Sequence, residues 1–223
     1  MHEIVMTVKA GLEKANATVT GKHTKTADIR KLSATVFRGI KDKAKDNIFL
    51  VCGELLEQHN WKMGVIAFDF AYRIKKQYDS TTFALFESWL EKYVRGWGDC
   101  DDFCTHAFGE LLIQKPTLFK EIARWTEREE FWMRRASAVV LISSIWHDHY
   151  ENIDPFYISD KLISDEHDLV RKGYGWMLKV LSCKVPQLVQ DYLVKNKNKM
   201  PRVAFRYAIE KMDKDKKQFL MGL

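Results

Sequence analysis

The chain has 223 residues, of which 46% are hydrophobic and 30% are charged, and it carries a net charge of +6. This length and composition support a substantial folded core, whereas the longest nearly apolar run, 138–146, is far too short to span a bilayer. The first residues also lack the basic-then-apolar order of a signal peptide, so we expect a cytoplasmic protein with no membrane partner.

The basic residues gather at the two ends of the chain. Residues 1–45 hold ten Lys and Arg against four Asp and Glu, and residues 195–217 hold nine against three. Each end therefore carries +6 and the middle of the chain carries −6. Basic ends around an acidic centre are typical of a protein that grips a polyanion at its flanks, although Lys-rich ends can also serve solubility alone.

Helical periodicity runs through nearly the whole chain, and no segment shows the alternation or the Asn-Gly and Asp-Gly turns of a hairpin. A polar gap from Asn16 to Thr26 is expected to be an exposed loop. Each of the four prolines stands just before an apolar helical pattern, where its fixed φ favours a helix start; they are Pro116, Pro155, Pro186 and Pro201. The predicted helices cover 3–15, 27–42, 46–58, 61–77, 80–94, 99–114, 117–127, 129–147, 155–164, 166–183, 186–195 and 201–212.

Short helices joined by short loops, with no element left over for a sheet, predict antiparallel helix pairs stacked side by side. Trp97, Arg135 and Trp176 are separated by 38 and 41 residues, close to the period of about 40 residues of HEAT-type pairs. Corresponding positions of successive repeats line one face of such a solenoid. We therefore predict a single all-α domain over 1–223, a HEAT-like α-solenoid superhelix with a concave basic face, the alternative being a compact helical bundle.

A tryptophan and three carboxylates stand together at 97–102, at the boundary between two predicted helices. Gly96 is expected to end the first helix in the left-handed conformation, and a carboxylate to cap the second. Asp101 would then lie in the first helical turn, where the helix dipole favours its ionised form. Capping alone can explain such acidic residues, but it does not require Trp97 beside them.

Four blocks of the sequence, in order, resemble the DNA alkylation repair enzymes with HEAT-like repeats, the AlkD-like DNA glycosylases. The blocks are WGDCD at 97–101, WMRRASA at 132–138, VRKGYGWML at 170–178 and RYAIEKM at 206–212. The resemblance covers roughly residues 27–212. It implies a cofactor-independent glycosylase, expected to be a monomer, that excises cationic alkylpurines such as 3-methyladenine and 7-methylguanine from duplex DNA.

The resemblance also implies roles for single residues. Asp101 corresponds to the catalytic carboxylate, and Trp97 and Trp176 to the aromatic contacts with the lesion. Arg135 would hold the DNA backbone, joined on the concave face by Arg171, Lys172 and Arg206. These residue types suit the chemistry: an ionised carboxylate stabilises positive charge that grows on the sugar, indole rings attract cations, and the planar fork of arginine binds phosphate.

Simpler roles for some of these side chains stay open. Arg135 could pair with a carboxylate of the neighbouring repeat. Trp176 could belong to the core, although Gly173 and Gly175 beside it would also let a DNA strand approach the backbone closely.

The sequence departs from the family pattern after the tryptophan, where Gly98 stands in place of a common aspartate. A one-residue shift in register would make Asp102 the catalytic group instead of Asp101. Because asparagine can still cap a helix, Asp101→Asn is expected to leave folding almost intact.

Other chemistries have less support. The four cysteines fit a reducing compartment, and Cys100, Cys104 and His106 lack a second ligand pair of suitable spacing, so we expect no metal and no cofactor. A non-catalytic HEAT-like protein that binds damaged, bent or branched DNA is the main alternative to the glycosylase. A protein-binding helical scaffold is the third possibility.

Overall fold

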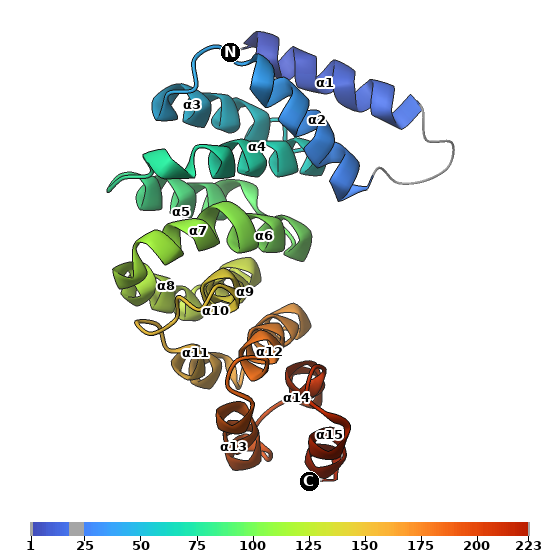
Figure 1. Cartoon of the computed structure of the whole chain (residues 1–223), viewed down its shortest axis with the longest axis vertical. Helices are drawn as coiled ribbons and strands as arrows, with labels where there is room; N and C mark the ends of the chain where they lie inside the picture. Colours follow the sequence, from blue (N-terminus) through green and yellow to red (C-terminus); the bar gives the residue numbers. More distant parts are fainter. Residues whose placement is uncertain (1, 18–24, 223) are drawn as a thin grey trace. The chain divides into compact units, whose positions relative to one another are not determined.

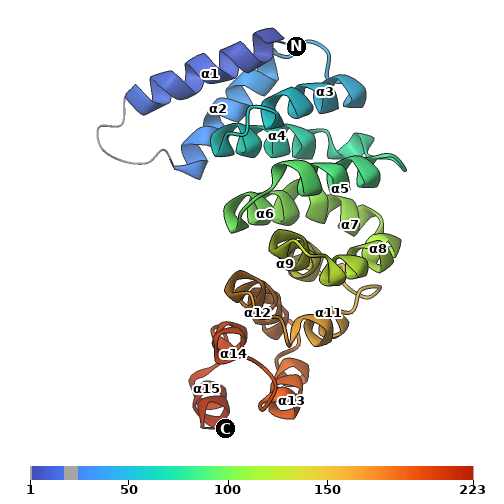
Figure 2. The ribbon, with the colours of Figure 1, turned by 180° about the vertical axis from the view of Figure 1, so that it is seen from behind.

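The computed structural model of the chain describes residues 2–17 and 25–222, and over these it is helical without any strand (Figure 1, Figure 2). The all-α class predicted from the sequence is therefore confirmed. The chain forms two compact units, Met1–Val94 and Arg95–Leu223. The single domain expected over 1–223 stays a prediction. Within the described ranges, no helix is both long and apolar enough to cross a membrane.

The first unit is built from antiparallel helices that pack on their sequence neighbours. Helix α3 packs on α4, α4 also contacts α2, and α1 lies against α2 and α3. Its core includes fully buried Phe68, Phe70 and Phe86, and the Phe86 ring stacks at 5.4 Å on that of Trp89. The elements are α1 (His2–Ala17), α2 (Thr26–Gly39), α3 (Lys45–Leu56), α4 (Trp61–Arg73), a 3₁₀ turn (Lys75–Gln77) and α5 (Thr82–Tyr93).

The second unit arranges its helices in two rows. Helices α6, α9, α12 and α14 pack on one another in succession, and α8, α11 and α13 form the second row beside them (Figure 1). The elements are α6 (Trp97–Phe103), a π-helical turn (Cys104–Phe108), α7 (Gly109–Gln114), a 3₁₀ turn (Pro116–Leu118), α8 (Phe119–Arg124), a second 3₁₀ turn (Trp125–Glu127), α9 (Phe131–Val139), α10 (Leu141–Trp146), α11 (Pro155–Leu162), α12 (Asp168–Ser182), α13 (Pro186–Asn196), α14 (Arg202–Ile209) and α15 (Lys214–Met221).

Side-chain hydrogen bonds that tie one helix pair to the next recur at similar sequence separations. In the first unit Ser33 donates to Asp69, 36 residues further on. In the second unit Ser143 bonds to the backbone of Thr105 across 38 residues, and Tyr192 bonds to Asp160 across 32 residues. Such a spacing is what stacked two-helix repeats produce, because equivalent positions of successive pairs lie side by side. The HEAT-like stacking expected from the sequence is therefore present within each unit.

Most predicted helix starts and ends lie within a few residues of those in the structure, but the helix predicted over 129–147 is divided into α9 and α10, and two further places differ. Pro116, Pro155 and Pro186 each occupy the first turn of a helix, and Pro201 immediately precedes α14, so all four act as starts. The predicted exposed loop between Asn16 and Thr26 falls largely on residues 18–24, which lie outside the described residues.

Helix α15 is the first difference, because the prediction ended the last helix at 212. The run of charges at 213–217 obscured the apolar residues that follow. Asp213 was the available signal: its carboxylate accepts a hydrogen bond from the Lys216 N–H at 2.8 Å and caps the helix, whose Leu220 is fully buried.

The second difference lies at Gly96, which does not adopt the expected left-handed conformation. Its φ of −147° and ψ of 175° are extended, and its carbonyl accepts from Cys100 N–H, so α6 begins already at Trp97. The expected carboxylate cap is absent at this start, and no side chain caps it. With 3.6 residues per turn, Asp101 lies in the second turn and not in the first.

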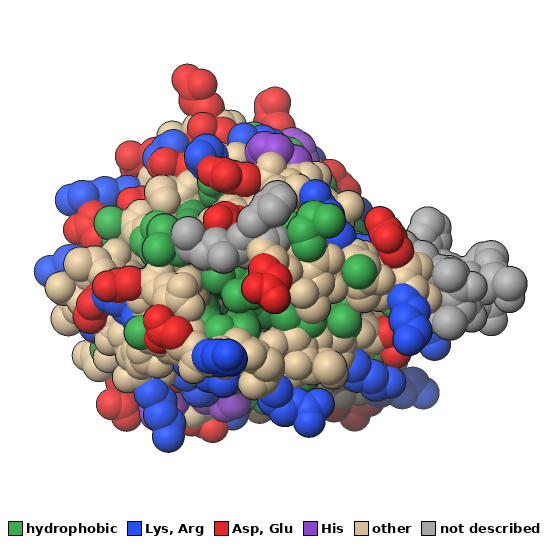
Figure 3. Space-filling model, turned by 90° about the horizontal axis from the view of Figure 1, so that it is seen from above, with side chains coloured by type: hydrophobic (Ala, Val, Ile, Leu, Met, Phe, Trp, Pro, Cys, Tyr) green, Lys and Arg blue, Asp and Glu red, His purple; other side chains and the backbone are tan. Residues whose placement is uncertain are grey.

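The first unit also carries a groove of about 670 Å³ between α1, α2 and the segment before α3. Ile4, Leu32, Val36 and Ile40 form its apolar part, and Glu3 and Asp42 lie at its sides. Figure 3, which views this unit from the side of α1, shows hydrophobic side chains exposed between charged ones. None of the residues predicted for the functional site lines this groove.

The core of the second unit generates a stability prediction. Trp125 is 1% exposed and meets Phe108 edge-on at 5.1 Å, whereas Trp146 is 60% exposed. Trp125→Ala should lower the free energy of unfolding by about 3–5 kcal/mol, because it removes a large buried ring and leaves a cavity. Trp146→Ala, the matched control, should change it by less than about 0.5 kcal/mol. Urea unfolding followed by far-UV circular dichroism measures both, and equal effects would contradict this packing.

Candidate functional site

Helix α6 carries both the tryptophan and the carboxylate singled out from the sequence. Trp97 begins the helix and is 57% exposed, so most of its indole ring is open to solvent. The Asp101 side chain, one helical turn later, retains 18% of its accessibility. The helix therefore presents an open aromatic ring one turn away from a partly accessible carboxylate.

Arg135 holds this carboxylate through a two-pronged ion pair. Its Nε and Nη2 atoms donate to Asp101 Oδ1 and Oδ2, each at 2.8 Å. Its Nη1 donates to the backbone carbonyl of Leu169 in the first turn of α12. The arginine is only 5% exposed. One side chain from α9 thus links the carboxylate of α6 to the backbone of α12.

The electrostatics of the pair favour its charged form. Burial by itself would lower the pKa of the Arg135 guanidinium, but the hydrogen bonds and the charge of Asp101 outweigh it and raise this pKa. The arginine therefore stays protonated. The pairing with a carboxylate of the neighbouring repeat, considered from the sequence, is what the structure contains. A contact of Arg135 with a DNA phosphate stays a prediction.

A π-helical turn follows α6 and begins three residues after Asp101, at Cys104. Thr105 Oγ1 donates to the carbonyl of Asp101 at 2.7 Å, and Ser143 Oγ from α10 donates to the carbonyl of Thr105 at 2.7 Å. A Cβ on Gly109 would lie 2.7 Å from Ser143 Oγ and 2.6 Å from the Cys104 carbonyl, so only glycine fits there. These contacts fix the backbone on the C-terminal side of the carboxylate.

The two cysteines of this region are buried and serve packing. Cys100 Sγ donates to the Trp132 carbonyl at 3.5 Å, and burial raises the pKa of the Cys104 thiol well above its ordinary value. No group of three or more His, Cys, Asp or Glu side chains suited to a metal occurs among the residues that the structure describes.

The neighbouring carboxylates differ from Asp101 in their surroundings. Burial raises the pKa of Asp99, and the negative charge of Asp102 adds to this shift, while the backbone N–H of Arg95 opposes it. Asp101 accepts the two-pronged contact from Arg135 on both of its oxygens. The register alternative, in which Asp102 carries the chemistry, is not decided by these contacts and stays a prediction.

Trp176 lies half-buried on α12, directly after Gly175 and three residues after Gly173. The glycines admit neighbouring protein helices: a Cβ on Gly173 would meet the side chain of Arg135 from 3.0 Å, and a Cβ on Gly175 would lie 2.8 Å from Ala204 O and Tyr207 Cβ of α14. The expectation that they let a DNA strand approach the backbone is therefore wrong, because the space is already filled by α9 and α14.

The remaining basic residues proposed to contact DNA differ in their contacts within the protein. Lys172 pairs with Asp168 at 2.6 Å, and Arg171 Nε donates to the Asp165 carbonyl at 2.6 Å. Arg206 on α14 is exposed. Arg206 can therefore contact a phosphate without breaking such an interaction. Lys172 would have to leave its exposed ion pair with Asp168, and Arg171 would have to break its hydrogen bond to the Asp165 carbonyl.

Sequence reasoning missed two contributors to this region. The Leu169 carbonyl has no side-chain signal that a pattern could reveal. Arg134, adjacent to Arg135, forks onto Asp165 with Nε at 2.5 Å from Oδ2 and so ties α9 to the loop before α12. The doubled arginine at 134–135 was the available signal, since consecutive residues on a helix point to different neighbours.

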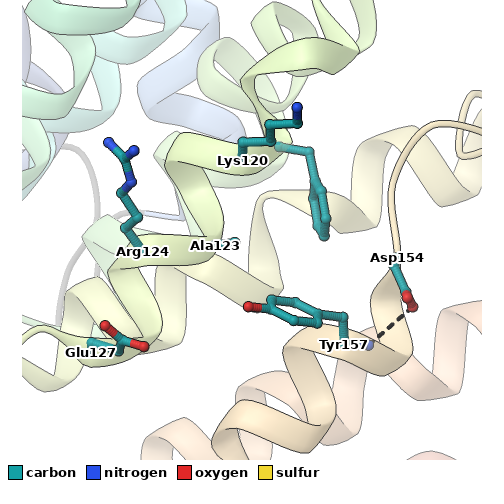
Figure 4. Close-up of a pocket in the computed structure, with 7 residues that line it drawn as sticks. Lys120, Ala123, Arg124, Glu127, Asp154 and Tyr157 are labelled. Carbon is teal, nitrogen blue, oxygen red and sulfur yellow. Dashed lines mark hydrogen bonds between the residues drawn. The ribbon is translucent and has the colours of Figure 1, made fainter.

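A separate cavity of about 420 Å³ lies between α8 and α11 in the second row of helices. Figure 4 shows Lys120 and Arg124 on one side of it and Tyr157 and Asp154 on the other, with the Asp154 carboxylate accepting from the Tyr157 N–H at 3.0 Å. None of the predicted site residues lines it. The candidate site on α6, α9 and α12 is therefore distinct from this cavity.

Stacked helix pairs that carry an arginine-held carboxylate beside an exposed tryptophan agree with the family resemblance. The sequence pattern of the DNA alkylation repair enzymes matches residues 21–212. The chain therefore belongs to the DNA alkylation repair enzyme family.

A solved structure of similar fold supports the architecture. It is a predicted DNA alkylation repair enzyme from Enterococcus faecalis, with a TM-score of 0.68 and 16% sequence identity, and the match covers 85% of this chain and 87% of that one. At this identity the likeness concerns the fold alone. No curated protein is significantly similar to the chain in sequence.

The ion pair changes the expectation for Asp101→Asn. Removing the carboxylate charge leaves the guanidinium of Arg135 buried without its counter-ion, so we expect a loss of roughly 2–4 kcal/mol in the free energy of unfolding, not an intact fold. Asp101→Asn with Arg135→Gln in one chain should be more stable than Asp101→Asn alone, because no unpaired charge remains. Thermal and urea unfolding of the single and double variants measure this. An unchanged stability of Asp101→Asn would contradict the coupling.

Proposed function

We propose that the protein is a monofunctional DNA glycosylase that hydrolyses the N-glycosidic bond of cationic alkylated purines in duplex DNA. The observation that carries the proposal is the fixed Asp101 carboxylate, which remains partly accessible one turn from the exposed ring of Trp97. Membership in the DNA alkylation repair family supports the substrate class.

The proposed reaction requires mainly that the protein stabilise positive charge on the sugar. An alkylated purine carries a positive charge and is a good leaving group, so the remaining barrier arises from positive charge that develops on the sugar. A carboxylate held in place stabilises that charge without reorganising during the reaction. Each carboxylate oxygen has two lone pairs, so the fork of Arg135 leaves the outer ones free to face the sugar or a water molecule.

The tryptophans would recognise the damaged base. An indole face attracts a cation by about 0.5–2 kcal/mol, which favours a cationic alkylpurine over a neutral base. Trp97 has most of its ring available for such a contact, and Trp176 has part of its ring available. Lys172, Arg171 and Arg206 are the proposed contacts to the phosphate backbone, with Arg206 requiring the least rearrangement.

The same ion pair also favours a second candidate function. Both oxygens of Asp101 accept from Arg135, which offsets part of the negative charge that catalysis would use. A protein that binds damaged, bent or branched DNA without breaking a bond would use the same surface. Incubation with methylated duplex DNA, followed by chromatography of the released bases, separates the two: release of a free alkylpurine identifies the glycosylase, and DNA binding without release identifies the alternative.

Asp101→Asn should reduce alkylpurine release by about 10²–10³-fold, measured at a temperature at which the variant remains folded. Residual release should persist, because the charge of the substrate already weakens its glycosidic bond. DNA affinity should change much less, since the carboxylate makes no favourable contact with phosphate.

Asp102→Asn is the matched control and should retain nearly full release. The reverse pattern, with release lost in Asp102→Asn and kept in Asp101→Asn, would move the catalytic role by one residue.

DNA binding should weaken steeply with salt, with a log–log slope of about −0.9 for each neutralised phosphate. Arg206→Ala and Lys172→Ala should each lower affinity across sequences and flatten the slope by about one unit. Lys120→Ala, an exposed lysine on α8 in the other row, should leave the slope unchanged. Fluorescence anisotropy at several salt concentrations measures all three. A slope near zero for the unaltered protein would identify a protein-binding scaffold.

A further inference from the structure

Gly173 on α12 packs closely against the side chain of Arg135. A Cβ built there would lie 3.0 Å from Cγ of Arg135, 3.3 Å from its Nη1 and 3.6 Å from Cγ2 of Val139. The residue lies inside a 15-residue helix, where alanine is intrinsically favoured over glycine. Its use there therefore calls for a packing reason, and the side chain of Arg135 supplies one.

The arginine has little freedom to move away from an added methyl group. Its Cγ lies in the middle of the side chain, and its Nη1 already donates to the Leu169 carbonyl of the same helix α12. Its Nε and Nη2 atoms donate to the oxygens of Asp101. A group that pushes on Cγ and Nη1 must therefore move the guanidinium relative to the carboxylate, or move α12 away from α9.

We infer that Gly173 is a positioning residue for the proposed reaction, which acts through Arg135 to set the place of the Asp101 carboxylate. Helix α12 contacts Arg135 at two points. The Leu169 carbonyl accepts a hydrogen bond from Nη1 of the guanidinium, and the absence of a side chain at Gly173 leaves room for the aliphatic part of Arg135. The expected effect of Gly173 on the reaction rate rests on the proposed function. Its expected effect on the Arg135–Asp101 ion pair rests on the packing alone.

The test is a double-mutant cycle on base release from methylated duplex DNA. Gly173→Ala should lower kcat by about 10- to 100-fold with little change in KM, because a small displacement of a catalytic group costs rate more than binding. In the Arg135→Ala background the two atoms that the methyl would strike are gone, so adding Gly173→Ala should change kcat less than about twofold. An equal loss in both backgrounds would overturn the inference, since it would show that Gly173 acts through general helix packing.

Gly53→Ala in α3 is the matched control for a glycine-to-alanine change inside a helix, because a Cβ there would meet nothing within 4 Å. It should leave release and binding unchanged. If Gly173→Ala does not fold, the Arg135→Ala and Gly173→Ala double variant should regain folding. Failure of the double variant while Arg135→Ala folds would also overturn the inference.

A second measurement does not depend on catalysis. The Arg135 Nε–H, bonded to Asp101, should give a slowly exchanging NMR signal in the unaltered protein and a faster-exchanging, shifted one in Gly173→Ala. An unchanged signal would show that Gly173 does not position the pair. If this signal responds but the unaltered protein releases no alkylpurine, the proposed function fails and the positioning of the ion pair by Gly173 stands.

Discussion

The candidate site depends on a single buried arginine. Arg135 joins three helices of the second unit by donating to the Asp101 carboxylate of α6 and to the Leu169 carbonyl of α12 from its own place on α9. Such a fork fixes a carboxylate in both position and orientation, because two parallel hydrogen bonds leave it no rotational freedom. The cost is that the pair must stay complete, since a buried guanidinium without its counter-ion is strongly destabilising.

The remaining contacts around the site support this pair. On the α6 side, the π-helical turn and Ser143 hold the backbone that follows Asp101. On the α12 side, the Arg134–Asp165 bridge holds the loop that leads into the helix. The cavity between α8 and α11 lies apart from these contacts.

The Arg135–Asp101 ion pair is compatible with both candidate functions, the glycosylase and the non-catalytic DNA-binding protein. An arginine that orients a carboxylate also shares its charge, so the arrangement can serve catalysis only where the remaining lone pairs face the reacting sugar. The proposed substrate class would reduce the demand on the protein, because a cationic base is already a good leaving group and a partly neutralised carboxylate would suffice.

The sequence by itself determined the helical class and most helix limits, whereas the residue types of the candidate site came from the family resemblance. The class and the helix limits depend on local physics: the periodicity of apolar side chains and the fixed φ of proline at the helix starts. Local reasoning failed at Gly96, whose extended conformation starts α6 earlier than expected, and at α15, whose Asp213 cap stands within a run of charges. The tertiary structure alone decided that Arg135 faces Asp101, 34 residues away, and that Gly173 makes room for it. Those choices arise from the packing of helices distant in sequence, which no local pattern encodes.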